Sequence, residues 1–267
     1  MRFQPRYTLA ACAVLLGLLA AGQSFAHLII SPMRFVFEDK TRRHTLMMMN
    51  TDSKTHTFRL GWKLMKMDEQ GQYQDLPPDD SNAFSVPKMV VFSPRQVTLA
   101  SNGRQNVNLA LRRPADLPPG EYRGHLLFDE LPEDEELGAT GESPSVKVKV
   151  VLGFTVPVIV RSGDIAQGEV TIGTPQLTSQ DNTSLLKLDI GHTPGVGSVY
   201  GQVIVKAADE QVGILNNVAI YPEMSKRTVN VPLTRPISPG ASVVVSYVGD
   251  GEYKGKTLAT KQTTVTQ

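Results

Sequence analysis

The side chains best suited to chemistry are scattered through this chain of 267 residues. Histidine could bind a metal or move a proton, and paired carboxylates could act as general acid and base. None of the histidines forms the i, i+4 pair of a helical zinc site; the five are His27, His44, His56, His125 and His192. We therefore expect scattered strand or surface histidines and no metal site.

Neighbouring acidic residues do not predict a catalytic pair either. Asp129 and Glu130 are adjacent, and adjacent side chains on a strand point to opposite faces. The sequence also has no Gly-x-Ser-x-Gly elbow and no phosphate-binding glycine loop. We predict a protein that is not an enzyme and that needs no cofactor.

The only cysteine, Cys12, lies in a segment with the three parts of a secretory signal. Arg2 and Arg6 give it a positive start, an apolar run covers 9–21, and Ser24-Phe25-Ala26 has the small residues that signal peptidase requires. A retained membrane anchor is the alternative, but the apolar run is shorter than the about 20 residues of a spanning helix. We predict that residues 1–26 are cleaved, which leaves a periplasmic protein without a stable membrane anchor.

Cleavage would also remove the cysteine and two of the cations. Lys plus Arg falls from 27 to 25 while Asp plus Glu stays at 26, so the formal charge of the mature chain becomes −1. A chain without cysteine must hold its fold by packing alone, without disulfides. The absence of a basic bias argues against nucleic acid as a partner.

The sequence pattern after the signal segment predicts short strands. Apolar and polar residues alternate over 58–64, 97–99 and 107–111, and turn residues such as Ser101-Asn102-Gly103 separate the runs. Many short strands at this spacing predict an all-β protein with an immunoglobulin-like sandwich. We place this N-terminal domain at 27–162.

A second group of strands follows Ser162-Gly163-Asp164 and predicts another β-sandwich, at 163–267. Pro232 should lie on an edge strand or at a strand end, because proline cannot donate to a ladder. The expected strands are 170–172, 185–190, 200–205, 229–233 and 243–247.

One run, 146–158, is about twice the usual strand length. Its even-numbered residues are bulky and apolar. They are Val146, Val148, Val150, Leu152, Phe154, Val156 and Val158. Such a strand is either central and covered by its own domain, or it is an edge strand that recruits another chain.

Four segments of the first domain, in this order, carry a family resemblance. They are 30–38 (ISPMRFVFE), 57–63 (TFRLGWK), 92–99 (FSPRQVTL) and 121–132 (EYRGHLLFDELP). Together with the long strand after them, they resemble the periplasmic pilus-assembly chaperones of the chaperone–usher pathway. The resemblance covers about residues 28–165, and the end of the long strand is most similar to the archaic or alternative branch.

The resemblance implies a function and two partners. Such chaperones bind pilus subunits by donating an edge strand and deliver them to an outer-membrane usher. The implied donor residues are Val146, Val148, Val150, Leu152 and Phe154. The family also binds the terminal carboxylate of the subunit with basic residues. Arg34 matches one family arginine, Arg123 matches the archaic branch, and Arg161 is a further candidate.

The alternative function is a secreted structural pilus subunit or an adhesin-like sandwich protein. Such a subunit needs a donor extension before its first strand. Only 27–29 would precede that strand here, which disfavours the alternative.

Overall fold

A computed structural model describes residues 28–78, 84–132, 153–165, 168–180, 183–193 and 195–266. The predicted signal, 1–26, lies outside these residues. Four predicted donor residues lie outside them as well, namely Val146, Val148, Val150 and Leu152. Within the described part, no helix is long and apolar enough to cross a membrane.

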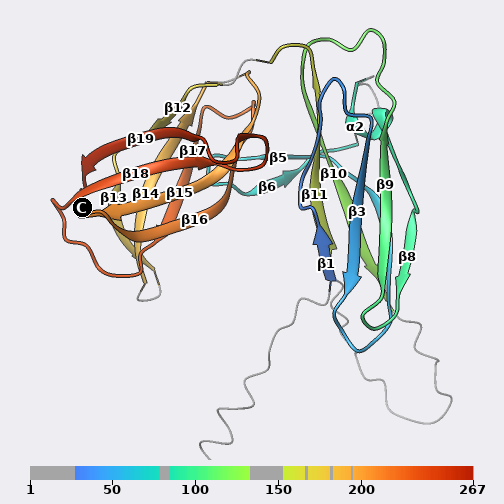
Figure 1. The fold of residues 1–267 in the computed structure, drawn as a ribbon, viewed down its shortest axis with the longest axis horizontal. Helices are drawn as coiled ribbons and strands as arrows, with labels where there is room; N and C mark the ends of the chain where they lie inside the picture. The colour runs from blue at the N-terminus through green and yellow to red at the C-terminus, as the bar shows by residue number, and fades with distance from the viewer. Residues whose placement is uncertain are drawn as a thin grey trace, which may run out of the picture.

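The first domain is a sandwich of two sheets, at the right of Figure 1. Its elements are β1 (Leu28–Ser31), β2 (Phe35–Phe37), β3 (Arg43–Asn50), β4 (His56–Lys63), α2 (Val86–Met89), β7 (Val90–Ser93), β8 (Gln96–Leu99), β9 (Arg104–Leu111), β10 (Gly120–Leu131) and β11 (Gly153–Ser162). One sheet has the order β1-β3-β9-β7 and the other β2-β11-β10-β4-β8. Alternating side chains of both sheets meet in one core cluster, which includes Phe35, Leu46, Leu109 and Phe128.

The first expected strand, 30–38, is divided between the two sheets. β1 pairs with β3 in one sheet, and β2 pairs in parallel with β11 in the other. The crossing takes place at Pro32-Met33-Arg34, where proline has no N–H for the ladder. The first domain therefore starts with two short successive strands, β1 in one sheet and β2 in the other.

The second domain, at the left of Figure 1, is also a sandwich. Its elements are β12 (Val170–Ile172), β13 (Gln176–Gln180), β14 (Thr183–His192), β15 (Val199–Ala207), β16 (Glu210–Ile220), β17 (Lys226–Pro232), β18 (Ser242–Gly249), the 3-10 turn η1 (Gly251–Tyr253) and β19 (Thr257–Thr264). One sheet joins β12, β13 and β17 to β14, and the other has the order β16-β15-β18-β19. The all-β prediction of two sandwiches is confirmed.

A hairpin of β5 (Met65–Met67) and β6 (Tyr73–Asp75) leaves the first domain and reaches the second (Figure 1). Met67 is buried within the core cluster of the second domain. The amide of Thr228 donates to the carbonyl oxygen of Glu69 at 2.7 Å, and the hydroxyls of Tyr73 and Tyr221 lie 3.0 Å apart. The sequence did not predict this hairpin, which joins the two domains.

β11 is the described end of the long alternating run. Its inward side chains are buried in the core of its own domain, but part of one backbone edge pairs with no described strand. Val156, Val158 and Val160 have no exposed area and face the core of their own domain. β10 pairs along one side of β11 down to Gly153, whereas β2 pairs on the other side only with Val158–Val160. Among the described residues, no strand pairs with the outer edge of Gly153–Pro157.

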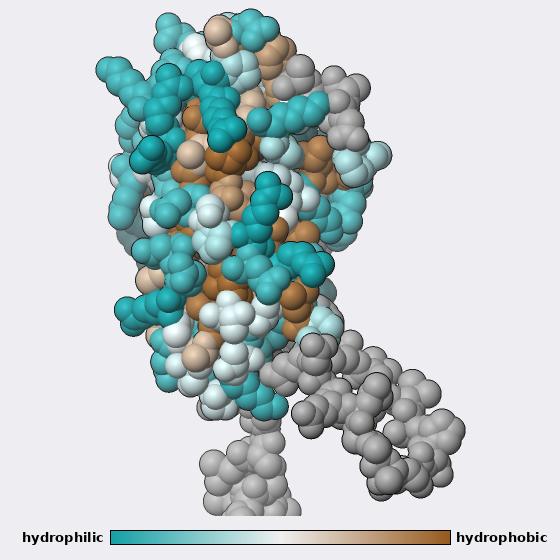
Figure 2. All heavy atoms as spheres, turned by 90° about the vertical axis from the view of Figure 1, so that its right-hand side faces the viewer, coloured by the Kyte–Doolittle hydropathy of each residue, from teal (hydrophilic) through white to brown (hydrophobic). Residues whose placement is uncertain are grey.

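The sheet β1-β3-β9-β7 contains none of the three predicted arginines. Figure 2 views the molecule from the side of the first domain and shows apolar side chains interrupted by polar ones. Ile29 of β1 is 46% exposed, and its partner across the ladder is Met49. The opposite sheet, which contains β10 and β11, faces the second domain and carries the predicted arginines.

Candidate functional site

The three predicted arginines all lie between the two domains. Arg123 is on β10 and Arg161 on β11, while Arg34 directly precedes β2 in the same sheet. On this face Ile159 is fully buried and belongs to the core cluster of the second domain. The sheet therefore presents its arginines beside a contact that already joins the domains.

Arg161 is held by carboxylates from both domains. Its Nε donates to Glu121 Oε2 at 2.9 Å, and its Nη2 lies 3.0 Å from Glu252 Oε1. Nη2 also donates to the carbonyl oxygen of Ser198 at 3.0 Å. Burial opposes the charge, but the carboxylates of Glu121 and Glu252 outweigh it and raise the pKa of Arg161. Since Glu121 is 2% exposed, the pair of Arg161 and Glu121 is a buried ion pair within the first domain, whereas the pair with Glu252 connects the two domains.

Arg34 lies beside Arg161 and shares two of its partners. Its Nη2 donates to Ser198 Oγ at 3.0 Å and to Glu252 Oε1 at 3.4 Å. The guanidinium also lies 4.8 Å from the ring centroid of Tyr200. Its Nε and Nη1 are buried and have no hydrogen-bond partner among the described residues. Arg34 thus keeps unused donors in a 9% exposed side chain.

Arg123 pairs with a different carboxylate of the second domain. Its guanidinium forms an ion pair with Glu223 and lies 3.4 Å from the ring centroid of Tyr221. Its Nη2 donates to the carbonyl oxygen of Met65 at 3.4 Å. Within the described part, its Nε has no partner. Arg123 is therefore oriented by its contacts and still has a donor to offer.

Arg34 and Arg161 lie side by side, because both contact Ser198 and Glu252. Arg123 forms its ion pair with a different residue, Glu223. Each guanidinium is compensated by a carboxylate of the protein itself. A carboxylate ligand would have to use the unused donors or replace one of these glutamates. Charge-assisted hydrogen bonds of this kind are short and directional, so they suit recognition of a chain terminus.

His125 lies on the same face of β10 and remains uncharged. Its burial, assisted by the charge of Arg123, lowers its pKa to about 3. Its ring packs edge-on against Tyr73 of the hairpin, with a centroid distance of 5.1 Å. A neutral His125 supports the interface and adds no positive charge to the arginines.

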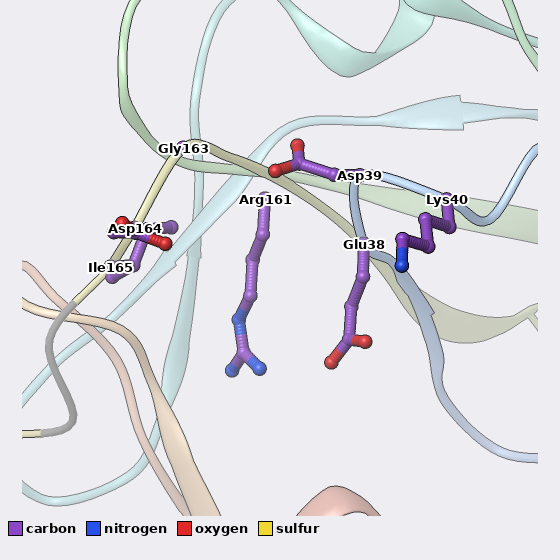
Figure 3. Close-up of a pocket in the computed structure, with 7 residues that line it drawn as sticks. All are labelled: Glu38, Asp39, Lys40, Arg161, Gly163, Asp164 and Ile165. Carbon is purple, nitrogen blue, oxygen red and sulfur yellow. The ribbon is translucent and has the colours of Figure 1, made fainter.

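A hollow of about 660 Å³ lies where the chain leaves the first domain. Figure 3 shows Arg161 and Glu38 extending side by side into it. Asp39, Asp164 and Lys40 complete its charged lining, so carboxylates outnumber cations among the described residues that line it. This hollow does not suit an anionic ligand.

Sequence reasoning missed the partners of these arginines. The residues it missed are Glu121, Ser198, Tyr200, Tyr221, Glu223 and Glu252. Glu121 could have been found, because it stands two positions before Arg123 on one strand and faces the same way. The other five belong to the second domain, and no spacing in the sequence relates them to the arginines. Within the described ranges, no group of three metal-ligating side chains could hold a metal ion.

Comparisons with known proteins give weak similarities only. No family profile matches the sequence, and no curated protein matches it. The fold is similar to that of the Pseudomonas aeruginosa CupB2 chaperone, with 15% identity, a TM-score of 0.48 and coverage of 89% of this chain and 100% of that one. A Salmonella enterica SafA pilin complex with the SafB chaperone matches with 14% identity, a TM-score of 0.48 and coverage of 91% and 98%.

A third similarity is to the CsuC–CsuE chaperone–tip adhesion subunit complex of the archaic chaperone-usher Csu pili of Acinetobacter baumannii. Its identity is 13%, its TM-score is 0.46, and it covers 90% of this chain and 99% of that one. With TM-scores under 0.5, these similarities establish no function for this chain.

Proposed function

We propose that this chain is a periplasmic chaperone that binds pilus subunits by donating an edge strand and delivers them to an outer-membrane usher. The observation that carries the proposal is the outer edge of β11 at Gly153–Pro157, which no described strand covers, in a sheet whose face carries Arg34 and Arg123. The sequence segments that resemble the pilus-assembly chaperones lie in the same domain.

The edge supports strand donation because the backbone groups on its outer side are unpaired, while β11 itself is held in place by its pairing with β10. β10 holds β11 along its inner side, from Ser162 to Gly153. An open edge of this kind normally recruits other chains, and soluble proteins avoid it unless they use it. Phe154, the described member of the donor set, is half-buried against the core of its own domain. It would form the base of the donated segment.

The remaining donors, Val146, Val148, Val150 and Leu152, lie outside the described residues and remain a proposal. In a subunit groove, each buried aliphatic side chain would stabilise the complex by about 1.5–3 kcal/mol. Binding of backbone along the edge would add the hydrogen bonds of a new strand. Side-chain pockets at every second position would fix the register of the pair.

Anchoring of the subunit carboxylate is assigned first to Arg123 and Arg34. Both retain buried donor nitrogens without a partner in the described part of the chain. Arg161 remains a candidate, but its contacts with Glu121 and Glu252 favour a role in holding the two domains together. The rival assignment, a structural pilus subunit or adhesin, is disfavoured because each sandwich buries a core cluster of its own between two sheets.

Capture of a pilin in the periplasm tests this function. The chain is co-expressed with a pilin, and co-purification is compared for wild type, Val150→Asp and Arg123→Ala. A buried unpaired charge or polar group costs several kcal/mol, so Val150→Asp should abolish capture. Arg123→Ala should weaken capture by about 1.5–3 kcal/mol, the value of a hydrogen bond to a charged group.

Circular dichroism of both variants is the control for folding. Folded variants that capture the pilin as well as wild type would contradict strand donation. An unfolded Val150→Asp chain would show that this residue belongs to the chaperone's own core, which also contradicts the proposal.

A further inference from the structure

A hollow of about 260 Å³ lies beside Arg123, between the start of the hairpin and the turn α2. Three stretches of chain contribute apolar side chains to its wall. Leu64 and Leu76 belong to the hairpin and its approach, Phe84 and Val86 to the start of α2, and Tyr122 to β10. An apolar cavity of about 150 Å³ is large enough for benzene, so this hollow has room for a large aliphatic or aromatic side chain.

The wall is held in place by close packing. Gly124 allows α2 to approach β10, since a Cβ there would lie only 3.1 Å from Val86 Cβ. The hydroxyl of Tyr122 donates to the carbonyl oxygen of Pro118 at 3.0 Å, and the ring lies 6.4 Å from that of Phe84. Leu76 is 42% exposed, so the hollow opens to solvent on that side.

One cation and one carboxylate share the rim with these apolar groups. The Arg123 side chain is 10% exposed, and its Nε has no partner among the described residues. Glu121 also borders the hollow; its Oε2 accepts from Arg161 at 2.9 Å, whereas its Oε1 is buried and has no hydrogen-bond partner among the described residues. The hollow therefore combines apolar wall groups with a guanidinium that pairs with Glu223 and has one unused, buried donor nitrogen. This combination fits a single residue that carries both an apolar side chain and a carboxylate, which is the C-terminal residue of a polypeptide.

We propose that this hollow binds the side chain of the subunit's last residue and selects an apolar one. The inference rests on the proposed function, in which Arg123 binds the terminal carboxylate. Arg123 then binds the C-terminal carboxylate of the subunit, and the hollow binds the side chain of the same residue. The arrangement gives the chaperone specificity for subunits with an apolar C-terminal residue.

Labelled peptides test the inference directly. The probes are fluorescein-labelled decapeptides that share the same nine polar residues and end in Phe or in Ser. Each is made with a free C-terminal carboxylate and with a C-terminal amide. Fluorescence anisotropy with the intact mature protein gives the affinities. We expect the Phe acid to bind on the order of 10-fold more tightly than the Ser acid. Amidation should weaken binding of the Phe peptide.

Two variants locate the effect. Leu76→Ser should reduce the Phe-over-Ser ratio several-fold, whereas Ile29→Ser should leave it unchanged. Ile29 is a suitable control because it is 46% exposed, close to the 42% of Leu76, and lies in the other sheet. Phe84→Ala provides a second variant of the wall and should also reduce the ratio.

The outcomes separate this inference from the proposed function. Equal affinities for the Phe and Ser acids, together with weaker binding of the amides, would contradict side-chain selection by the hollow. They would still support binding of the carboxylate by Arg123. A ratio that survives both wall variants would also overturn the hollow. Equal binding of acid and amide would overturn the anchor at Arg123, and no binding of any peptide would contradict both.

Discussion

Arg161 of the first domain lies 3.0 Å from Glu252 of the second, and the ion pair is largely shielded from solvent. The same guanidinium binds Glu121 of the neighbouring strand. One side chain thereby ties the last strand of the first domain to the turn η1 of the second. This contact joins the domains beside the hairpin of β5 and β6, and Arg34 shares its partner Glu252.

Removal of Arg161 should destabilise the protein strongly. Arg161→Ala leaves Glu121 buried without its partner, and breaking a buried pair in this way costs about 3–5 kcal/mol. Urea unfolding measures the change. Arg235→Ala is the control, because Arg235 and Glu210 are 47% and 69% exposed. Such a surface pair contributes at most about 1 kcal/mol. Equal effects of the two substitutions would contradict a strongly stabilising buried pair of Arg161 and Glu121.

Truncation of Met67 should weaken the hairpin that joins the domains. Met67 is 6% exposed and belongs to the core cluster of the second domain, although its strand starts from the first. Met67→Ala should cost about 2–5 kcal/mol in the free energy of unfolding. Met33→Ala serves as the matched control, since Met33 is 59% exposed and should change stability by less than about 0.5 kcal/mol. A small effect at Met67 would mean that the hairpin is not bound to the second domain in solution.

A pH dependence should come from His56, which lies between two carboxylates. Its Nδ1 lies 2.5 Å from Glu130 and its Nε2 lies 2.8 Å from Asp52. Both nitrogens can donate only in the protonated ring. Burial lowers the pKa of His56, but the hydrogen bonds with Asp52 and Glu130 outweigh it, and the pKa rises above its ordinary value.

The raised pKa fixes the direction of the effect. The stabilisation is fully present below the unfolded-state pKa of about 6.5 and is lost as the pH rises through the folded-state pKa. Urea unfolding of wild type and His56→Gln should therefore differ more at about pH 6 than at about pH 9. His44→Gln is the control, since the His44 ring contacts the carbonyl oxygen of Val36 at 3.0 Å. A difference that grows with pH would contradict a charged His56.

Strong alternation predicted the interior strands well. Residues 185–190 and 200–205 fall within β14 and β15, whose inward side chains are buried. Pro232 ends β17, which pairs with β14 at the edge of its sheet, so the expectation of an edge strand or a strand end is confirmed. In these strands the core itself dictates the pattern.

The missed elements lack that pattern. β19 has the sequence TLATKQTT and β13 has QLTSQ, and both are edge strands in which no residue is fully buried. The strand β3 was also missed, because its apolar run Leu46-Met47-Met48-Met49 has no polar residue at alternate positions. The pairing of Arg123 with Glu223 joins residues 100 positions apart, and only the packing of two complete domains brings them together.

The most direct measurement is amide hydrogen exchange of the protein alone and in complex with a co-expressed pilin. If the open edge of β11 is the donated strand, the amides within Gly153–Val156 that point away from β10 should exchange much more slowly in the complex, while those of strand β7 remain unchanged. Unchanged exchange along β11 in an intact complex would contradict the account, because the subunit would then be bound elsewhere.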